Sequence, residues 1–311
     1  DQLVPELKDH WSATNFTTKG NWETVFGKSL ATDELFQAWF YARYANTVAA
    51  AGRKEYPLPM YVNAALNYRN LQPGQYPSAG PLPHIMDIWQ AAAPSIDMLS
   101  PDFYNPYFKH YNDLYTRRNN PLFIPEIRLE PSDAAKVFYA VGHYQAIGFA
   151  PFSIESADHP ENQAIGKSYS VLTQLAPDIL KYRGTGKMDA VLLDTGTKTQ
   201  ELVLGNYKLT ISHDYTLGWS SEAAKAGWPV SGAVIIHEND DEFMIGGTGI
   251  VITFTTNGDE NLTTGILQAE EGKYMNAVWG KGRRMNGDQD HQGRHIRIPV
   301  GEWSIQKVKL Y

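Results

Sequence analysis

The stretch PLFIPEIRLE at residues 121–130 decides the fold. An apolar run leads directly into the ionisable Glu126, and Arg128 follows two places later. Short runs of this kind are typical of strands that are buried on both faces of a parallel sheet. A carboxylate at the end of such a strand requires a physical reason, and the neighbouring segments suggest one.

Helical and strand-like segments alternate on both sides of this stretch. Short runs rich in β-branched and aromatic residues predict strands at 58–67, 96–104, 121–129 and 146–155. Helical spacing predicts helices at 31–52, 83–94, 106–118 and 132–145, and within 161–183. The first helix is expected to begin with Thr32 as its N-cap and to end at Gly52. Strands that are each followed by a helix predict parallel βαβ units.

Polar residues occur at the C-terminal end of each predicted strand, namely Asn63, Asp102 with Tyr104, Glu126 with Arg128, and Glu155. In (β/α) barrels, catalytic and binding groups gather at this end of the strands. We therefore interpret Glu126 as a rim carboxylate that could serve as nucleophile, general base or metal ligand. Asn63, Asp102, Tyr104 and Glu155 are predicted to contact substrate because they occupy the same position.

Each of these residues also has a purely structural interpretation. Glu126 could form an ion pair with Arg128 or another cation. Asp102, Tyr104 and Glu155 could instead fix loops through hydrogen bonds. The segment PGQYPSAGP at 73–81 is expected to be a rigid loop that either lines a pocket or only makes the turn.

Beyond YRGTGKMD at 182–189 the pattern changes to short strands separated by glycine-rich turns. Regular spacing of this kind favours an antiparallel β-sandwich. The sequence therefore predicts an α/β domain at 1–185 and an all-β domain at 186–311. Within the second domain, GGTG at 246–249 is expected to be a hairpin turn.

The composition excludes several classes of protein. With 42% hydrophobic and 20% charged residues, the 311-residue chain has the composition of a globular protein. Its net charge of −7 argues against a nucleic-acid partner, and no run approaches the ~20 apolar residues of a membrane span. The chain has no cysteine, which excludes disulfides and thiolate sites. The compartment stays open, with the periplasm or the extracellular space favoured.

The sequence indicates no cofactor and no metal. Asp288, Asp290, His291 and His295 lie close together in NGDQDHQGRH at 286–295 and could bind a cation. Their spacing matches no recognised ligand set, so a solvated loop with paired charges is the favoured interpretation. Motifs of the GxSxG, P-loop and HExxH types are absent from the sequence.

Several long segments resemble a known family. PLPMYVNAALN, PGQYPSAGP, DIWQAAAPSIDMLSPDFYNPYF and NNPLFIPEIR resemble the bacterial β-galactosidases of glycoside hydrolase family 35, in the branch whose barrel is also similar to family 42. GAVIIHENDDEFMIGGTGIVITF and WSIQKVKLY resemble the β-sandwich domain appended to that branch. The resemblance extends over essentially the whole chain.

The resemblance implies a retaining mechanism on a (β/α)8 TIM barrel. The family's nucleophile is a glutamate at the end of the seventh strand, and the matching FIPE motif places it at Glu126. The family's acid/base glutamate follows an asparagine at the end of the fourth strand. No Asn-Glu pair occurs in this sequence. The four predicted strands would then be the fifth to eighth of the barrel, and residues 1–52 the connection after the fourth.

We therefore expect this chain to be the C-terminal half of such a barrel with its β-sandwich, and to pair with an N-terminal half that supplies the acid/base. Half of a closed barrel has two open sheet edges, which favours such pairing. The expected substrate is a β-galactoside or related glycan. No membrane partner is expected, and the chain could form a homo-oligomer. The alternatives are a non-catalytic carbohydrate-binding or scaffolding protein and a β-glycosidase for another sugar.

Overall fold

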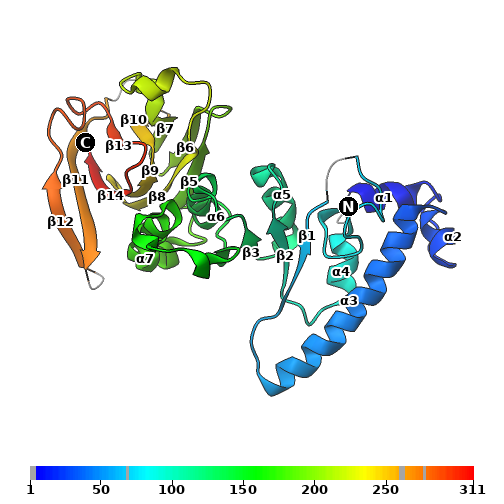
Figure 1. Cartoon of the computed structure of the whole chain (residues 1–311). Coiled ribbons are helices and arrows are strands. Elements are labelled where there is room, and N and C mark those ends of the chain that lie inside the picture. The colour runs from blue at the N-terminus through cyan, green and yellow to red at the C-terminus, as the bar shows by residue number, and fades with distance from the viewer. Residues whose placement is uncertain (1–4, 68–69, 259–262, 276–277) are drawn as a thin grey trace. The chain divides into compact units, whose positions relative to one another are not determined.

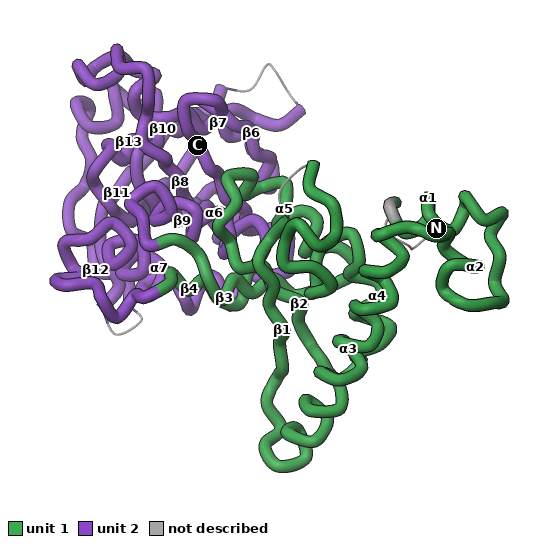
Figure 2. The backbone as a smooth tube through the Cα atoms, turned by 45° about the vertical axis from the view of Figure 1, so that its right-hand side comes forward, with its two compact units in different colours: residues 1–128, 146–152 green, residues 129–145, 153–311 purple. Residues whose placement is uncertain are grey.

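The computed structural model describes residues 5–67, 70–258, 263–275 and 278–311. The chain forms two compact units (Figure 2). Unit 1 comprises residues 1–128 and 146–152, and unit 2 comprises residues 129–145 and 153–311. Unit 1 contains a parallel sheet with helices, and unit 2 contains two antiparallel sheets with helices (Figure 1).

Four strands form the sheet of unit 1 in the order in which they follow along the chain. They are β1 (Tyr61–Ala65), β2 (Met98–Phe103), β3 (Phe123–Ile127) and β4 (Gly148–Pro151). Every neighbouring pair is parallel. The predicted parallel sheet is therefore confirmed, and each strand is shorter than the apolar run that predicted it.

The helices of unit 1 precede and connect these strands. They are α1 (Pro5–Ser12), α2 (Trp22–Phe26), α3 (Leu30–Glu55), α4 (Met86–Ala92) and α5 (Phe108–Tyr115), with 3-10 turns η1 (Pro83–Ile85) and η2 (Arg117–Asn119). The predicted N-cap at Thr32 is wrong, because the hydroxyl of Ser29 accepts the hydrogen bond from the Thr32 amide at 3.2 Å. The helix also continues past Gly52, and α1 and α2 have no counterpart in the prediction.

A buried asparagine fixes the start of β2. The side chain of Asn120 accepts a hydrogen bond from the Leu99 amide at 2.9 Å and donates to the Leu99 carbonyl at 2.8 Å. It also donates to the carbonyl of Tyr115 at the end of α5. Because buried polar groups need partners, this one residue ties the strand to the helix that follows it. These hydrogen bonds fix the N-terminal part of β2 and thereby help to position the polar residues at its C-terminal end.

The helices of unit 2 pack on antiparallel strands. They are α6 (Lys136–Gly142) and α7 (Ala164–Tyr182), with 3-10 turns η3 (Pro131–Asp133), η4 (Ile154–Ser156) and η5 (Pro160–Asn162). A Cβ atom at Gly142 would lie 2.6 Å from the Cβ of Ala190, so glycine permits the close approach of α6 to the sheet. A membrane-spanning helix is not found among the described helices, since none combines sufficient length with sufficient apolarity.

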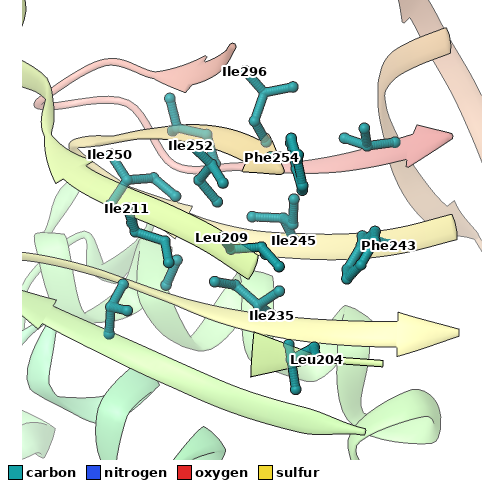
Figure 3. Close-up of a cluster of buried hydrophobic side chains, with 14 of the residues drawn as sticks. Leu204, Leu209, Ile211, Ile235, Phe243, Ile245, Ile250, Ile252, Phe254 and Ile296 are labelled. Atoms are coloured by element: carbon teal, nitrogen blue, oxygen red, sulfur yellow. The ribbon is translucent and has the colours of Figure 1, made fainter. Parts of the chain in front are cut away.

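Two antiparallel sheets make up the rest of unit 2. Their strands are β5 (Met188–Leu193), β6 (Thr199–Leu204), β7 (Tyr207–His213), β8 (Ser231–Asn239), β9 (Glu242–Thr248), β10 (Ile250–Thr256), β11 (Ile266–Met275), β12 (Val278–Arg284), β13 (Ile296–Ile298) and β14 (Ser304–Leu310), with 3-10 turns η6 (Asp214–Leu217) and η7 (Ser221–Ala224). The sheet orders are β13-β10-β7-β6 and β12-β11-β14-β9-β8-β5. Apolar side chains from both sheets form one buried cluster (Figure 3).

The chain crosses between the two sheets at Gly249, so the hairpin predicted at residues 246–249 is wrong. Strand β9 pairs with β8 and β14, whereas β10 pairs with β7 and β13. Gly249 has φ +70°, and a Cβ atom there would lie 2.0 Å from the hydroxyl oxygen of Ser231. Glycine is needed at this crossing because a side chain would be both strained and obstructed.

The antiparallel strands begin at Met188, close to the predicted domain boundary after residue 185. The compact units nevertheless group α6 and α7 with these strands, on which the two helices pack. The helices that follow β3 and β4 in the chain thus belong to unit 2, although their sequence pattern is that of βαβ units.

Candidate functional site

Polar side chains gather at the C-terminal ends of β2 and β3 in unit 1, together with Asn63 from the middle of β1. Asp102 of β2 is the register partner of Ala65 on one side and of Glu126 on the other. Register partners on neighbouring strands project to the same face of a sheet. Asp102 and Glu126 therefore lie side by side, and Asn63, two residues before Ala65, projects to the same face. We call Asn63, Asp102, Tyr104 and Glu126 the strand-end group.

The phenol of Tyr104 holds the carboxylate of Glu126. Its hydroxyl donates to Oε2 of Glu126 at 2.9 Å, and the Glu126 side chain is half-buried. The guanidinium of Arg128 donates to the backbone carbonyl of Tyr104, at a long 3.4 Å. Among the residues that the structure describes, no cation forms an ion pair with Glu126. The carboxylate is thus oriented by a neutral donor, without the ion pair that the structural interpretation required.

Burial raises the pKa of Tyr104 to about 12, and the hydrogen bond and negative charge of Glu126 act in the same direction. The phenol therefore stays protonated at neutral pH and can only donate to the carboxylate. Hydrogen bonds from a hydroxyl to a carboxylate are stronger than those between neutral groups. Tyr104 consequently fixes one oxygen of the Glu126 carboxylate.

An amide and a carboxylate form the other half of the strand-end group. Nδ2 of Asn63 donates to Oδ1 of Asp102 at 2.7 Å. Burial raises the pKa of Asp102, the hydrogen bond from Asn63 opposes this shift, and the charge of Glu126 adds to it. The pair presents both hydrogen-bond donors and acceptors beside Glu126, which is the chemistry that recognises hydroxyl groups.

Glu155 lies outside the strand that was predicted to end with it. Strand β4 ends at Pro151, and Ser153 adopts a left-handed conformation with φ +58°. Glu155 follows in the turn η4, which belongs to unit 2, and its side chain is exposed. The predicted strand at 146–155 is therefore too long, and the role of Glu155 as a substrate contact stays a prediction.

A second group of side chains, centred on Glu34 of α3, fastens the loop at 73–81 next to β1. The Glu34 side chain accepts hydrogen bonds from Nε2 of His84 at 2.8 Å, the hydroxyl of Tyr76 at 2.9 Å and the amide of Ala79 at 3.0 Å. Ala79 has φ +68°, and its carbonyl accepts from the indole of Trp89 at 3.0 Å. These hydrogen bonds anchor Tyr76 and Ala79 of the loop to α3, and the rigidity of the loop stays a prediction.

The Glu34 carboxylate is only 3% exposed, yet its surroundings favour its charge. Burial acts to raise the pKa of Glu34, but the hydrogen bond and charge of His84, with the donors on Ala79 and Tyr76, outweigh burial and lower it. No local pattern points to this residue, because Tyr76 and His84 are 42 and 50 positions away.

No group of three or more His, Cys, Asp or Glu side chains that could hold a metal occurs within the part of the chain that the structure describes. In the segment 286–295, the rings of His291 and His295 lie 5.1 Å apart, and both pack against Trp219. Burial lowers the pKa of His295, and the charges of His291 and Arg297 lower it further. These histidines take part in ring packing.

Comparison with known proteins identifies a domain family whose description names no activity. Residues 165–297 match a family described as a domain of unknown function, DUF5597. The matched region runs from α7 to β13 and leaves out β1 to β4, so it does not include the strand-end group. No curated protein matches the chain.

Proposed function

We propose that this protein is a retaining, exo-acting glycoside hydrolase for β-galactosides, with Glu126 as its nucleophile. The observation that carries the proposal is the 2.9 Å hydrogen bond from Tyr104 to Glu126 at the C-terminal edge of a parallel sheet. This edge is where (β/α)8 barrels place their catalytic groups. An oriented, ionised carboxylate is what a covalent glycosidase needs, and the FIPE resemblance supports the same assignment.

The chemistry has two steps. In the first, an oxygen of Glu126 attacks C1 of the galactosyl unit, the bond from C1 to the leaving oxygen breaks, and an acid donates a proton to that oxygen. In the second, the same acid, now a base, takes a proton from water, and the water oxygen attacks C1. The glycosyl–Glu126 bond breaks, and the carboxylate is restored. Tyr104 would hold the Oε2 atom throughout, so that the other oxygen is directed at C1.

Asn63 and Asp102 would bind sugar hydroxyls beside the reacting carbon. Their 2.7 Å hydrogen bond keeps the amide and carboxylate together, and each retains polar atoms for a ligand. Sugars are recognised mainly through hydrogen bonds from neutral groups. The strand-end group agrees with this, because a neutral hydroxyl holds Glu126 and no ion pair to Glu126 occurs among the described contacts.

In this proposal, β1 to β4 are half of a (β/α)8 barrel, and the antiparallel sheets form the β-sandwich that follows it. The strands β1 and β4 are the two edges of the parallel sheet. Open edges of parallel strands are normally covered or closed into a barrel. We therefore propose that an N-terminal portion of the same protein adds four strands and the acid/base glutamate.

An apolar stripe on α3 supports a covering partner for unit 1. Phe36, Phe40, Tyr44 and Val48 are 48%, 51%, 75% and 56% exposed. Because they recur at every fourth position, they lie along one face of the helix. Contiguous exposed apolar surface of this kind marks a place where another protein segment packs. We assign that segment to the N-terminal portion that completes the barrel.

One observation favours a second candidate function. The strand-end group contains a single glutamate, and the carboxylate beside it belongs to Asp102, which is engaged by Asn63. A carbohydrate-binding or scaffolding protein without hydrolytic activity would fit such a group. This candidate predicts sugar binding without turnover even after every associated chain is supplied.

The activity of the Glu126→Gln variant tests the proposal. The protein, together with any chain that co-purifies with it, is assayed on a panel of aryl β-glycosides. We expect hydrolysis of the galactoside by the unmodified protein and at least a ~1,000-fold loss in the variant, since the nucleophile is removed. Glu130→Gln, which changes an exposed carboxylate four residues later, is the matched control. Near-normal hydrolysis by Glu126→Gln would refute the assignment.

A further inference from the structure

A cavity of about 420 Å³ lies entirely within unit 2, between the first turns of α7, the middle of β11 and the turn that leads into β14. Its size falls within the range of about 300–1,000 Å³ that is typical of small-molecule sites. Trp303 forms an aromatic wall, and the other side chains that line the cavity are mostly polar or charged. No part of the strand-end group contributes to it.

The indole of Trp303 is held in a fixed orientation. Its Nε1–H donates to the hydroxyl oxygen of Ser168 at 2.9 Å, and the Ser168 hydroxyl in turn donates to the carbonyl of Ala134 at 2.7 Å. Ser168 is completely buried. Because one edge of the ring is anchored on a buried hydroxyl, the aromatic wall is preorganised and costs little entropy when a ligand binds.

Hydrogen-bonding groups surround the indole. The ammonium of Lys167 lies 5.2 Å from the centre of the Trp303 ring. The side-chain oxygen of Gln174 accepts from the amide of Tyr274 at 3.1 Å, and its NH2 group donates to the carbonyl of Ser170 at 3.0 Å, which leaves one N–H for a ligand. The hydroxyl oxygen of Ser304, which also lines the cavity, is buried and has no hydrogen-bond partner among the described residues. The cavity therefore combines an apolar ring face with donors and acceptors.

The charges in the cavity favour a neutral ligand. The lysines Lys167 and Lys273 are opposed by three glutamates, and one of these, Glu271, forms an ion pair with Arg283 at 3.3 Å. The two remaining glutamates, Glu161 and Glu302, balance the two lysines. A site for an anion or a cation would concentrate one sign of charge, and this lining does not.

The local backbone shapes the cavity floor. The pairing of β11 with β12 shifts register between Glu271 and Gly272, where Gly282 is the extra residue of a β-bulge on β12. A Cβ atom at Gly272 would lie 2.5 Å from the carbonyl oxygen of Gly280 on β12, so glycine is required for the bulge to fit. Bulges bend a strand and redirect its side chains, and they are frequent beside functional sites.

We propose that this cavity is a second saccharide-binding site, which takes one neutral pyranose unit. The apolar C–H face of the sugar would stack on Trp303, and its hydroxyls would bond to the side chains of Lys167, Gln174 and Ser304. Lys167 would leave the ring face to donate to a hydroxyl. The site would retain a glycan chain without cleaving it. The choice of a galactoside as ligand rests on the proposed function, whereas the site itself does not.

The test uses the full-length chain with the Glu126→Gln substitution, so that no turnover depletes the ligand. The protein is labelled with ¹⁵N on its tryptophan indoles, and the Trp303 signal is assigned with a Trp303→Phe variant. Methyl β-galactoside is then titrated. We expect a saturable shift of the Trp303 indole signal, with a dissociation constant on the order of 1 mM.

Two lysine variants localise the binding. Lys167→Met removes the ammonium at the cavity and should weaken binding about tenfold, since it deletes a charged hydrogen-bond donor. Lys198→Met is the matched control, because Lys198 lies over the ring of Trp228, outside the cavity lining. Equal effects of the two substitutions would contradict the proposal.

The remaining outcomes separate this site from the proposed function. A shift with methyl β-glucoside and none with the galactoside would support the saccharide site and count against the proposed substrate. A Trp303 shift with sulfate and with neither sugar would overturn the inference, as it would reveal an anion site. No shift of Trp303 with either sugar at about 50 mM, well above the expected dissociation constant, would overturn it as well.

Discussion

Asp102 and Glu126 are register partners at the C-terminal ends of two neighbouring parallel strands, so two carboxylates lie side by side on one face of the sheet. The pKa of Asp102 is raised by burial and, in addition, by the charge of Glu126, although the hydrogen bond from Asn63 opposes the shift. Two like charges on neighbouring strands disfavour the folded state, and a function is one reason for a protein to retain them. This pairing leads to the first prediction.

Asp102→Asn is expected to increase the stability of the protein and to lower its activity. A carboxyl group with a raised folded-state pKa disfavours the folded state increasingly as pH rises through its unfolded value of 3.8. The stability of the variant relative to the unmodified protein should therefore increase as the pH rises from below 3.8 through the raised folded-state pKa of Asp102. Turnover of the galactoside should fall about 10–100-fold if Asp102 binds a sugar hydroxyl. Denaturant unfolding at each pH measures the change in stability, and kcat/KM at pH 7 measures the change in activity. A stability difference that stays constant with pH would contradict this reasoning.

Tyr104→Phe is expected to lower kcat about 10–100-fold while leaving the unfolding transition nearly unchanged, because the partly exposed phenol mainly orients Glu126. Since the phenol keeps its proton up to a pKa of about 12, its contribution should not vary between pH 5 and pH 9. Steady-state kinetics over that range measure the effect. Tyr56→Phe, at an exposed tyrosine of unit 1, serves as the control and should have wild-type rates.

Glu34→Gln is expected to destabilise the protein by about 1–3 kcal/mol at pH 7. The substitution replaces a buried carboxylate by a neutral amide and so weakens the three hydrogen bonds that the carboxylate accepts. The lowered pKa of Glu34 means that its contribution is present above the unfolded value of 4.5 and is lost as pH falls through the folded value. The difference in free energy of unfolding between protein and variant should therefore shrink below about pH 4.

The control for Glu34 is Glu55→Gln, which changes an exposed glutamate at the C-terminal end of the same helix. This variant should remain within about 0.5 kcal/mol of the unmodified protein at every pH. A Glu34→Gln difference that persists unchanged to pH 3 would show that the carboxylate's charge is not what holds the loop at 73–81.

Phe40→Glu tests the covering partner proposed for α3. A charge in the middle of the apolar stripe should weaken association with the N-terminal portion, because a buried unpaired carboxylate is costly. Native mass spectrometry of the protein as isolated should show a second chain that is lost in this variant. Leu180→Glu, at an exposed leucine of α7, should retain that chain. Retention of the partner by both variants would contradict the assignment of the stripe.

The parallel sheet could be predicted because its strands are short apolar runs, each of which ends in polar residues. The residues Asn63, Asp102, Tyr104 and Glu126 could be chosen for the same reason, since strand ends meet at one edge of a parallel sheet. Their pairing could not, because register and side-chain direction depend on tertiary packing. Glu155 shows the limit, as a left-handed residue at Ser153 ends the strand early and no apolar pattern signals it.

Other features could not be predicted from the sequence, because the residues that form them are far apart in the chain or because their types fit more than one structure. The glycines of GGTG are typical of a hairpin, but they permit close packing inside β9 and the crossing at Gly249. The network around Glu34 joins a helix to a loop more than 40 residues later. Trp303 lies in a short turn before β14, and nothing in its neighbours indicates that its indole lines a cavity.

A covalent trap tests the central claim most directly. The protein, with any chain that accompanies it, is incubated with a 2-fluoro-β-galactoside bearing a good leaving group, and the tryptic peptides are analysed by mass spectrometry. We predict that the peptide 119–128, NNPLFIPEIR, gains the mass of one fluorogalactosyl unit on Glu126. A label on any other carboxylate of an active preparation would contradict the claim that Glu126 is the nucleophile.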